Sequence, residues 1–188
     1  MKLNNIFYNI FMNNEEKTLK KNQLYKGRII DFYDDEIECP NGDIAYREYV
    51  HHPGGSAVLA ILENKIVFEK QYRYPYHKEI LELPAGKLEK GEDPLVAAKR
   101  ELEEETGLIS EGLIKVGELY PSPGYTDEVI YLFFSENNKK GTIKRDKDEF
   151  MDLIYLDIKE AYALLDNGEI KDSKTQILLY KLRDKLLK

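Results

Sequence analysis

The chain has 188 residues, 42% of them hydrophobic, which suits one domain or one domain with a small appendage and excludes intrinsic disorder. Its formal net charge of −7, without any Lys/Arg-rich block, excludes an electrostatic nucleic-acid surface, and no apolar stretch approaches membrane-spanning length. The single cysteine, Cys39, excludes an internal disulfide framework, so we expect a cytoplasmic enzyme with neither nucleic acid nor membrane as partner.

The first fifty residues predict a small antiparallel sheet. Residues 1–21 are polar apart from a short apolar run at 6–12, which lacks the flanks of a signal peptide; they form either a mobile arm or a docking segment. An Asn-Gly pair at 41–42 indicates a tight hairpin. Three short strands are expected, at 24–32, 36–40 and 44–50. So small a meander has little core of its own, so it must pack on the rest of the chain or on a second subunit.

The segment His51-His52-Pro53-Gly54-Gly55 marks a boundary, giving an N-terminal part (1–50) and a main domain (51–188). We interpret the two histidines as loop residues, because no third soft ligand lies nearby. Beyond them, longer and more apolar strands alternate with helices, which predicts an α/β/α sandwich with a mixed sheet. The expected strands are 57–62, 66–71, 80–83, 113–119, 129–134 and 151–156, and the expected helices lie between Asp93 and Gly107, at 157–166 and at 173–187.

The most informative stretch is 86–108, GKLEKGEDPLVAAKRELEEETGL. Asp93 is a good N-cap and Gly107 a natural left-handed stop, so a helix of about a dozen residues lies between them. Its C-terminal half carries four carboxylates in five residues, Glu101, Glu103, Glu104 and Glu105. Like charges one turn apart repel, and the helix dipole disfavours negative charge at this end. The helix therefore either presents a solvated acidic face or holds divalent cations such as Mg²⁺, which prefer carboxylate oxygens.

The same stretch matches the Nudix box, G-x5-E-x7-R-E-U-x-E-E-x-G-U with U a bulky aliphatic residue, at every defined position. The matching residues are Gly86, Glu92, Arg100, Glu101, Leu102, Glu104, Glu105, Gly107 and Leu108. The chain thus resembles the Nudix hydrolase family. The resemblance implies an α/β fold, a Nudix α/β/α sandwich with a mixed sheet plus the small N-terminal antiparallel sheet. It also implies hydrolysis of a nucleoside diphosphate linked to another moiety, with two or three Mg²⁺ or Mn²⁺ ions.

The resemblance also implies roles within the box. Glu101 and Glu105 are the first expected metal ligands and Glu104 the third, with Glu104 and Glu105 counted as catalytic. In the family the carbonyl just before the box glycine is a further ligand, and here it belongs to Ala85. Arg100 is expected to hold Glu104, one turn away, rather than to contact substrate. Glu92 is expected to brace the loop or the helix start.

Outside the box, from about residue 20 onward, the chain resembles the bacterial ADP-ribose pyrophosphatase branch of the family. The resemblance rests on Lys70-Gln71-Tyr72-Arg73, on Glu82-Leu83-Pro84-Ala85-Gly86, and on a proline fifteen residues past the box, Pro123. It implies that Arg73 contacts a phosphate or ribose, although a surface arginine on a strand is the alternative. It also implies that Glu82 and Pro123 lie on the substrate side.

An acidic loop near residue 149 and the small sheet complete the expected site. In related enzymes such a loop brings a general base over the metals; Glu149 is our choice and Asp148 the alternative, against a merely solvated charge. The family holds adenine with the small sheet, often from the partner subunit. The candidates here are Arg47 and either Phe32 or Tyr33, since the chain has no tryptophan.

The sequence therefore predicts a cytoplasmic ADP-ribose diphosphatase that releases AMP and ribose 5-phosphate, as a homodimer with exchanged N-terminal sheets. One alternative is another Nudix nucleoside diphosphate sugar hydrolase, of the UDP-glucose or GDP-mannose type. A non-catalytic Nudix module that only binds a nucleotide is the other; it is disfavoured because every acid of the box is present.

Overall fold

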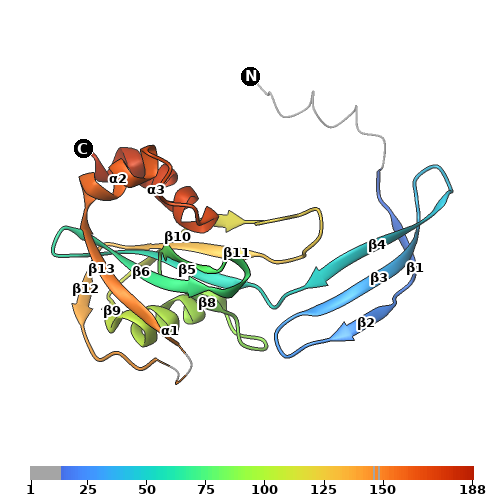
Figure 1. Ribbon diagram of the computed structural model, residues 1–188, viewed down its shortest axis with the longest axis horizontal. Helices are drawn as coiled ribbons and strands as arrows, with labels where there is room; N and C mark the ends of the chain where they lie inside the picture. The colour runs from blue at the N-terminus through green and yellow to red at the C-terminus, as the bar shows by residue number, and fades with distance from the viewer. Residues whose placement is uncertain (1–13, 146, 148) are drawn as a thin grey trace. The chain divides into compact units, whose positions relative to one another are not determined.

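The computed structural model describes residues 14–145, 147 and 149–188, which fall into two compact units (Figure 1). The first unit takes the described part of Met1–His52 together with Ser122–Asp127. The second takes the described residues of Pro53–Pro121 and Glu128–Lys188. Each unit has its own sheet.

The sheet of the first unit is antiparallel and centres on β3 (Asp31–Glu38). One edge of β3 pairs with β4 (Ile44–His51), and the other pairs with the two short strands β1 (Lys17–Lys20) and β2 (Gln23–Lys26). The small N-terminal antiparallel sheet is confirmed, but the predicted strands 24–32 and 36–40 are wrong in their bounds, and β1 was not predicted.

The predicted strand bounds are wrong because glycine and aspartate, which usually favour turns, take different positions in this sheet. The chain turns at Gly27, whose N–H donates to the carbonyl of Ile30 (3.0 Å), within the predicted strand. The residues left between the two predicted strands include Asp34 and Asp35, and both lie inside β3. Asp35 is buried there and accepts a hydrogen bond from the backbone N–H of Asn22 (2.9 Å).

A segment from far along the chain completes this unit. The N–H of Val50 donates to the carbonyl of Tyr125 (2.8 Å), and the N–H of Asp127 donates to the carbonyl of Val50 (3.2 Å). The carboxylate of Asp127 also contacts Nδ1 of His51 (2.6 Å) and accepts from the N–H of His52 (2.9 Å). The prediction that both histidines are loop residues is wrong for His51, which is the last residue of β4 and pairs with Asp31, and right for His52. Asp127 contacts both of them.

The second unit is built on a seven-stranded sheet around β5 (Gly55–Leu62), in which every residue is buried. The sheet order is β10 (Leu113–Leu119), β11 (Ile130–Ser135), β5, β6 (Lys65–Arg73) and β13 (Met151–Asp157), with β7 (Lys78–Glu82) on β6 and β8 (Ala85–Lys87) on β5. β5 and β11 run parallel and the other pairs antiparallel, so the sheet is mixed. A separate pair, β9 (Leu108–Ser110) with β12 (Asn138–Lys140), and the short 3₁₀ helix η2 (Tyr74–Tyr76) were not predicted.

Helices cover both faces of this sheet (Figure 1). α1 (Pro94–Thr106) packs on one face through a core that includes Val58 and Leu102. α2 (Ile158–Asp166) and α3 (Ser173–Leu186) pack on the other through a core that includes Leu59 and Leu178. The predicted α/β/α sandwich is confirmed. No helix in the described ranges is long and apolar enough to cross a membrane.

Candidate active site

Helix α1 presents two acids to strand β8 because its ends and its apolar stripe fix its rotation. Asp93 caps the helix by accepting the N–H groups of Leu95 (2.9 Å) and Val96 (3.3 Å). Gly107 ends it in the left-handed conformation with φ of 70°. Glu101 and Glu105, one turn apart beside the buried Leu102, are themselves only 8% and 5% exposed. Two carboxylates are therefore held inside the protein rather than on a solvated face.

The backbone at Gly86 forms a cradle for the first of these acids. A Cβ added to Gly86 would lie 1.9 Å from Cδ of Glu101, so any side chain there would collide with the carboxylate. The preceding residue, Ala85, donates its N–H to Oε2 of Glu105 (3.1 Å). Because the N–H and C=O of one residue in an extended strand point to the same side, the Ala85 carbonyl faces the same acids.

Arg100 is occupied by contacts within the protein. Its guanidinium donates to Glu92 (3.0 and 2.9 Å), to Glu101 (2.8 Å), to Glu104 (3.0 Å) and to the carbonyl of Lys87 (3.1 Å). The hydrogen bonds with Glu92 raise the pKa of Arg100 and lower that of Glu92. Arg100 thus ties the loop at Glu92 to the acids of the helix, as the spacing predicts for Glu104.

Two further residues of this site were not predicted from sequence. Glu69 lies in the middle of β6, 4% exposed, and its Oε1 has no hydrogen-bond partner among the described residues. Burial raises the pKa of Glu69 against the lowering charges of Arg145 and Lys174. Arg145 donates to the backbone carbonyls of Glu105 (2.9 Å) and Met151 (2.7 Å). An acid within a buried strand such as IVFEKQ was the signal available in the sequence for Glu69.

The carboxylates repel one another. Burial raises the pKa of Glu105 most, and the charges of Glu69, Glu101 and Glu149 raise it further, while the N–H of Ala85 lowers it. Burial raises the pKa of Glu101 as well, where the charge of Glu149 adds to the effect and Arg100 opposes it. Four acids from β6, α1 and the loop before β13 therefore share one region, and the positive charge around them does not offset their repulsion.

The described residues do not include a group of three or more His, Cys, Asp or Glu side chains already arranged as metal ligands. The chemistry of the cluster nevertheless fits a hard divalent cation. The donors are carboxylate oxygens and one backbone carbonyl, Glu69 leaves a buried oxygen unpaired, and the repulsion around Glu105 is what a cation would relieve.

A second charged cluster adjoins the first on the neighbouring strand. Glu82 of β7 lies directly opposite Glu69 and is 4% exposed. Arg73 donates two hydrogen bonds to Glu82, from Nε to Oε1 (2.7 Å) and from Nη2 to Oε2 (2.6 Å). Lys174 of α3 also donates to Glu82. Burial opposes ionisation of Glu82, but Arg73 and Lys174 outweigh it and hold its pKa below the usual value. Lys174 was not predicted, although its spacing of four residues from Leu178 and eight from Leu182 places it on the buried stripe of α3.

The predicted site residues fall into both units. Arg73, Glu82, Ala85, Glu101, Glu104, Glu105 and Glu149 belong to the second unit, whereas Arg47 and Pro123 belong to the first. Arg47 lies on β4, where its guanidinium pairs with Glu16. Tyr33 stacks on Tyr49, with ring centroids 5.1 Å apart. Asp148 lies outside the described residues.

Comparison with known proteins adds four findings. A family model described as NUDIX domain matches residues 51–176. The chain is 45% identical to an ADP-ribose pyrophosphatase of Bacillus subtilis (strain 168), over 86% of this chain and 89% of that protein. It is 48% identical to a methanol dehydrogenase activator of Bacillus methanolicus, over 90% and 93%. A solved structure titled as an ADP compounds hydrolase shares the fold, with a TM-score of 0.80 over 92% of this chain and 95% of that one, at 17% identity.

Proposed function

The chain belongs to the Nudix family, and from that premise we propose that it hydrolyses the diphosphate bond of ADP-ribose, giving AMP and ribose 5-phosphate. The observation that carries the proposal is the buried pair Glu101 and Glu105 at the Gly86 cradle, since a cluster of acids without matching cations is suited to binding metal and phosphate together. The choice of ADP-ribose rests on the similarity to the B. subtilis pyrophosphatase.

We assign the metal ligands to Glu101, Glu104, Glu105 and the carbonyl of Ala85, and propose that two or three Mg²⁺ or Mn²⁺ ions bind there. When bound, such ions neutralise diphosphate charge and lower the pKa of a coordinated water. The chain's own residues do the positioning. Arg100 fixes Glu101 and Glu104, and the Ala85 N–H fixes Glu105. Arg73, whose side chain is 40% exposed, contacts a substrate phosphate or ribose with the edge that Glu82 leaves free.

Glu149 is our proposed general base. Its charge raises the pKa of both Glu101 and Glu105, and it lies two residues before Met151, where β13 starts. A carboxylate there can hold the attacking water and accept its proton.

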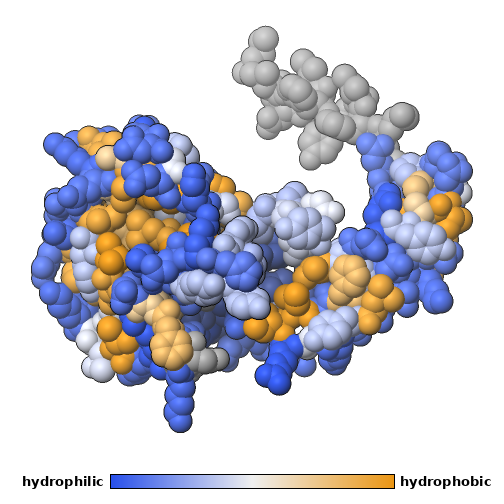
Figure 2. Space-filling view, in the orientation of Figure 1, coloured by the Kyte–Doolittle hydropathy of each residue, from blue (hydrophilic) through white to orange (hydrophobic). Residues whose placement is uncertain are grey.

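We further propose that the first unit, predicted as residues 1–50, pairs two copies of the chain and supplies the adenine contacts, with Arg47 and either Phe32 or Tyr33 as the candidates. Pro123 is proposed to lie on the substrate side. Figure 2 shows apolar side chains on the surface of the unit that contains β1–β4. The exposed large hydrophobic residues of this unit include Leu24, Ile30, Ile44 and Tyr46, all 43% or more exposed. A sheet of this size with an apolar surface gains stability by covering it, and a second copy is the occupant that the exchanged-sheet prediction names. The proposed setting is the cytoplasm.

A substrate panel tests the proposal. The purified chain is assayed with Mg²⁺ on ADP-ribose, UDP-glucose and GDP-mannose, with Glu105→Gln as the matched inactive control. AMP release from ADP-ribose at a kcat/KM well above that of the two nucleotide sugars supports the proposal. If a nucleotide sugar is turned over as fast as ADP-ribose or faster, ADP-ribose is not the preferred substrate and the proposal is wrong. If the compounds bind but none is hydrolysed, the chain is a nucleotide-binding module.

The similarity to the methanol dehydrogenase activator favours a second candidate function, in which the chain raises the activity of a dehydrogenase. The two functions are compatible if activation requires hydrolysis. Adding wild type and Glu105→Gln separately to purified B. methanolicus methanol dehydrogenase distinguishes the cases, because only wild type activates when hydrolysis is required.

A further inference from the structure

We propose that Lys174 is a positioning residue that fixes Arg73 for the substrate by sharing the carboxylate of Glu82. The inference rests on the proposed function, because it takes Arg73 as a substrate contact. It assigns the first turn of α3, remote in sequence from the Nudix box, to the substrate side of the site.

Three charged groups meet at the carboxylate of Glu82. Lys174 is 8% exposed and Glu82 is 4% exposed, whereas the side chain of Arg73 is 40% exposed. Oε2 of Glu82 accepts hydrogen bonds from both Lys174 and Arg73, and Oε1 accepts from Arg73 alone. Of these three groups only Arg73 is substantially open to a ligand, so the buried pair behind it determines where its guanidinium points.

Two carboxylates hold the ammonium group of Lys174, that of Glu82 and that of Asp172. Asp172 caps α3 by accepting the N–H of Thr175 (2.9 Å), and it also accepts from Nζ of Lys174 (2.9 Å). The hydroxyl of Thr175 in turn accepts the N–H of Leu83 (2.8 Å), the residue after Glu82. The helix start and the end of β7 are thus joined by hydrogen bonds at two neighbouring residues, and the buried ammonium group has two carboxylate partners.

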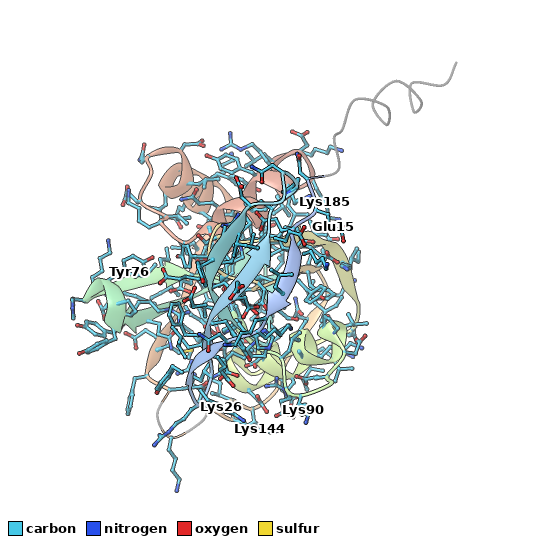
Figure 3. All side chains as sticks on the ribbon, turned by 90° about the vertical axis from the view of Figure 1, so that its right-hand side faces the viewer. Glu15, Lys26, Tyr76, Lys90, Lys144 and Lys185 are labelled. Atoms are coloured by element: carbon cyan, nitrogen blue, oxygen red, sulfur yellow. The ribbon has the colours of Figure 1, made fainter. Side chains whose placement is uncertain are left out.

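A cavity of about 330 Å³ opens at this cluster. Arg73, Glu82 and Lys174 line it together with Lys78, Tyr76 and the first turn of α3. Figure 3 shows Tyr76 at the end of a hairpin that projects from the sheet. The exposed part of the Arg73 guanidinium faces this cavity, where a ligand can reach it.

Loss of Lys174 would change binding more than bond cleavage. Glu82 would lose one of its two cations, and Oε2 would be free to move with Arg73, so the guanidinium would no longer be held in one orientation. The proposed metal ligands lie on α1 and β8 and touch neither Lys174 nor Arg73 in any hydrogen bond or ion pair described here. The expected signature is a raised KM with a nearly unchanged kcat.

The kinetic test compares Lys174→Met and Lys174→Arg with Lys181→Met, which removes an exposed lysine from the same helix. With ADP-ribose as substrate, Lys174→Met should raise KM about tenfold and leave kcat within about twofold, because one charge-assisted hydrogen bond is lost. Lys174→Arg should recover part of the loss, and Lys181→Met should match wild type. A double variant with Glu82→Gln should be no worse than Glu82→Gln alone. An unchanged KM with a kcat reduced in step with the folded fraction would overturn the proposal, since that is the signature of a purely structural residue.

A second measurement does not depend on turnover. The Nε–H resonance of Arg73, assigned by its absence in Arg73→Lys, should be shifted and slow to exchange in wild type because Glu82 accepts it. In Lys174→Met it should move toward the position of an exposed arginine, and in Lys181→Met it should stay. If wild type fails to cleave ADP-ribose, the proposed function falls while this resonance still decides the role of Lys174. An unchanged resonance in Lys174→Met overturns the role.

Discussion

Gly86→Ala is the sharpest test of how the backbone and the acids fit together. The new Cβ would lie 1.9 Å from Cδ of Glu101 and 2.1 and 2.3 Å from its oxygens. Carbon atoms in contact stay roughly 3.5 Å apart or more, so the carboxylate must shift by about 1.5 Å. Displacement of a catalytic group by about 1 Å costs on the order of 10²-fold in rate, and we expect kcat to fall by about that factor or more. Overpacking should cost about 1–3 kcal/mol of folding free energy, which leaves the chain folded if its stability is ordinary.

The assay is ADP-ribose turnover across a Mg²⁺ titration, with thermal unfolding measured alongside. Gly112→Ala is the matched control, because a Cβ there meets no atom within 4 Å. The apparent Mg²⁺ affinity of Gly86→Ala should weaken together with kcat. Glu101→Asp shortens the displaced side chain, so adding Gly86→Ala to it should cost less than adding it to wild type. Wild-type kcat and Mg²⁺ affinity in Gly86→Ala would refute the assignment of Glu101 to the metal site.

Three other outcomes are expected. Glu105→Gln should lower kcat on the order of 10²-fold or more at saturating Mg²⁺, since a metal ligand is lost; turnover like wild type would remove Glu105 from the site. In EDTA, wild type should lose stability as pH rises above the ordinary carboxyl value of 4.5, because the raised pKa values of Glu69 and Glu105 make the unfolded chain release protons that the folded chain retains. Thermal unfolding at pH 6 and pH 8 checks this, and Mg²⁺ should raise the melting temperature more at pH 8. Deleting residues 1–50 should give monomers with poor affinity for ADP-ribose by analytical ultracentrifugation and kinetics; a tight, active monomer would contradict a shared site.

Much of the second unit could be predicted because its strongest signals are local. Asp93 and Gly107 bound α1 as their capping chemistry requires, and the Asp157–Glu160 pair marks the start of α2. The strands β8, β9 and β12 could not be found, since three residues carry no periodicity. In the first unit aspartate is unfavourable within a strand, and Asp35 lies inside β3 with tertiary hydrogen bonds from Asn22 and Tyr49 that no local pattern announces.

The site divides along the same line. The spacing of Glu101 and Glu105 within one contiguous motif was enough to place them on the same side of one helix. Glu69, Arg145 and Lys174 act through partners on other elements, and pairings between strands and helices distant in sequence are not encoded in any local pattern. For Lys174 the helical period indicates a position on the buried stripe of α3, but it does not identify Glu82 as the carboxylate that pairs with the lysine.

The strip Ser122–Asp127, hydrogen-bonded to Val50, makes the polypeptide cross between the two units three times. A ribosome that has released the first four strands has therefore not yet synthesised the piece that closes them. The first unit is therefore incomplete, with one strand edge unpaired, until five of the seven strands of the Nudix sheet have been synthesised. Expressing the N-terminal fifty residues alone would reproduce that incomplete species, a target for chaperones and for edge-to-edge association rather than a finished domain.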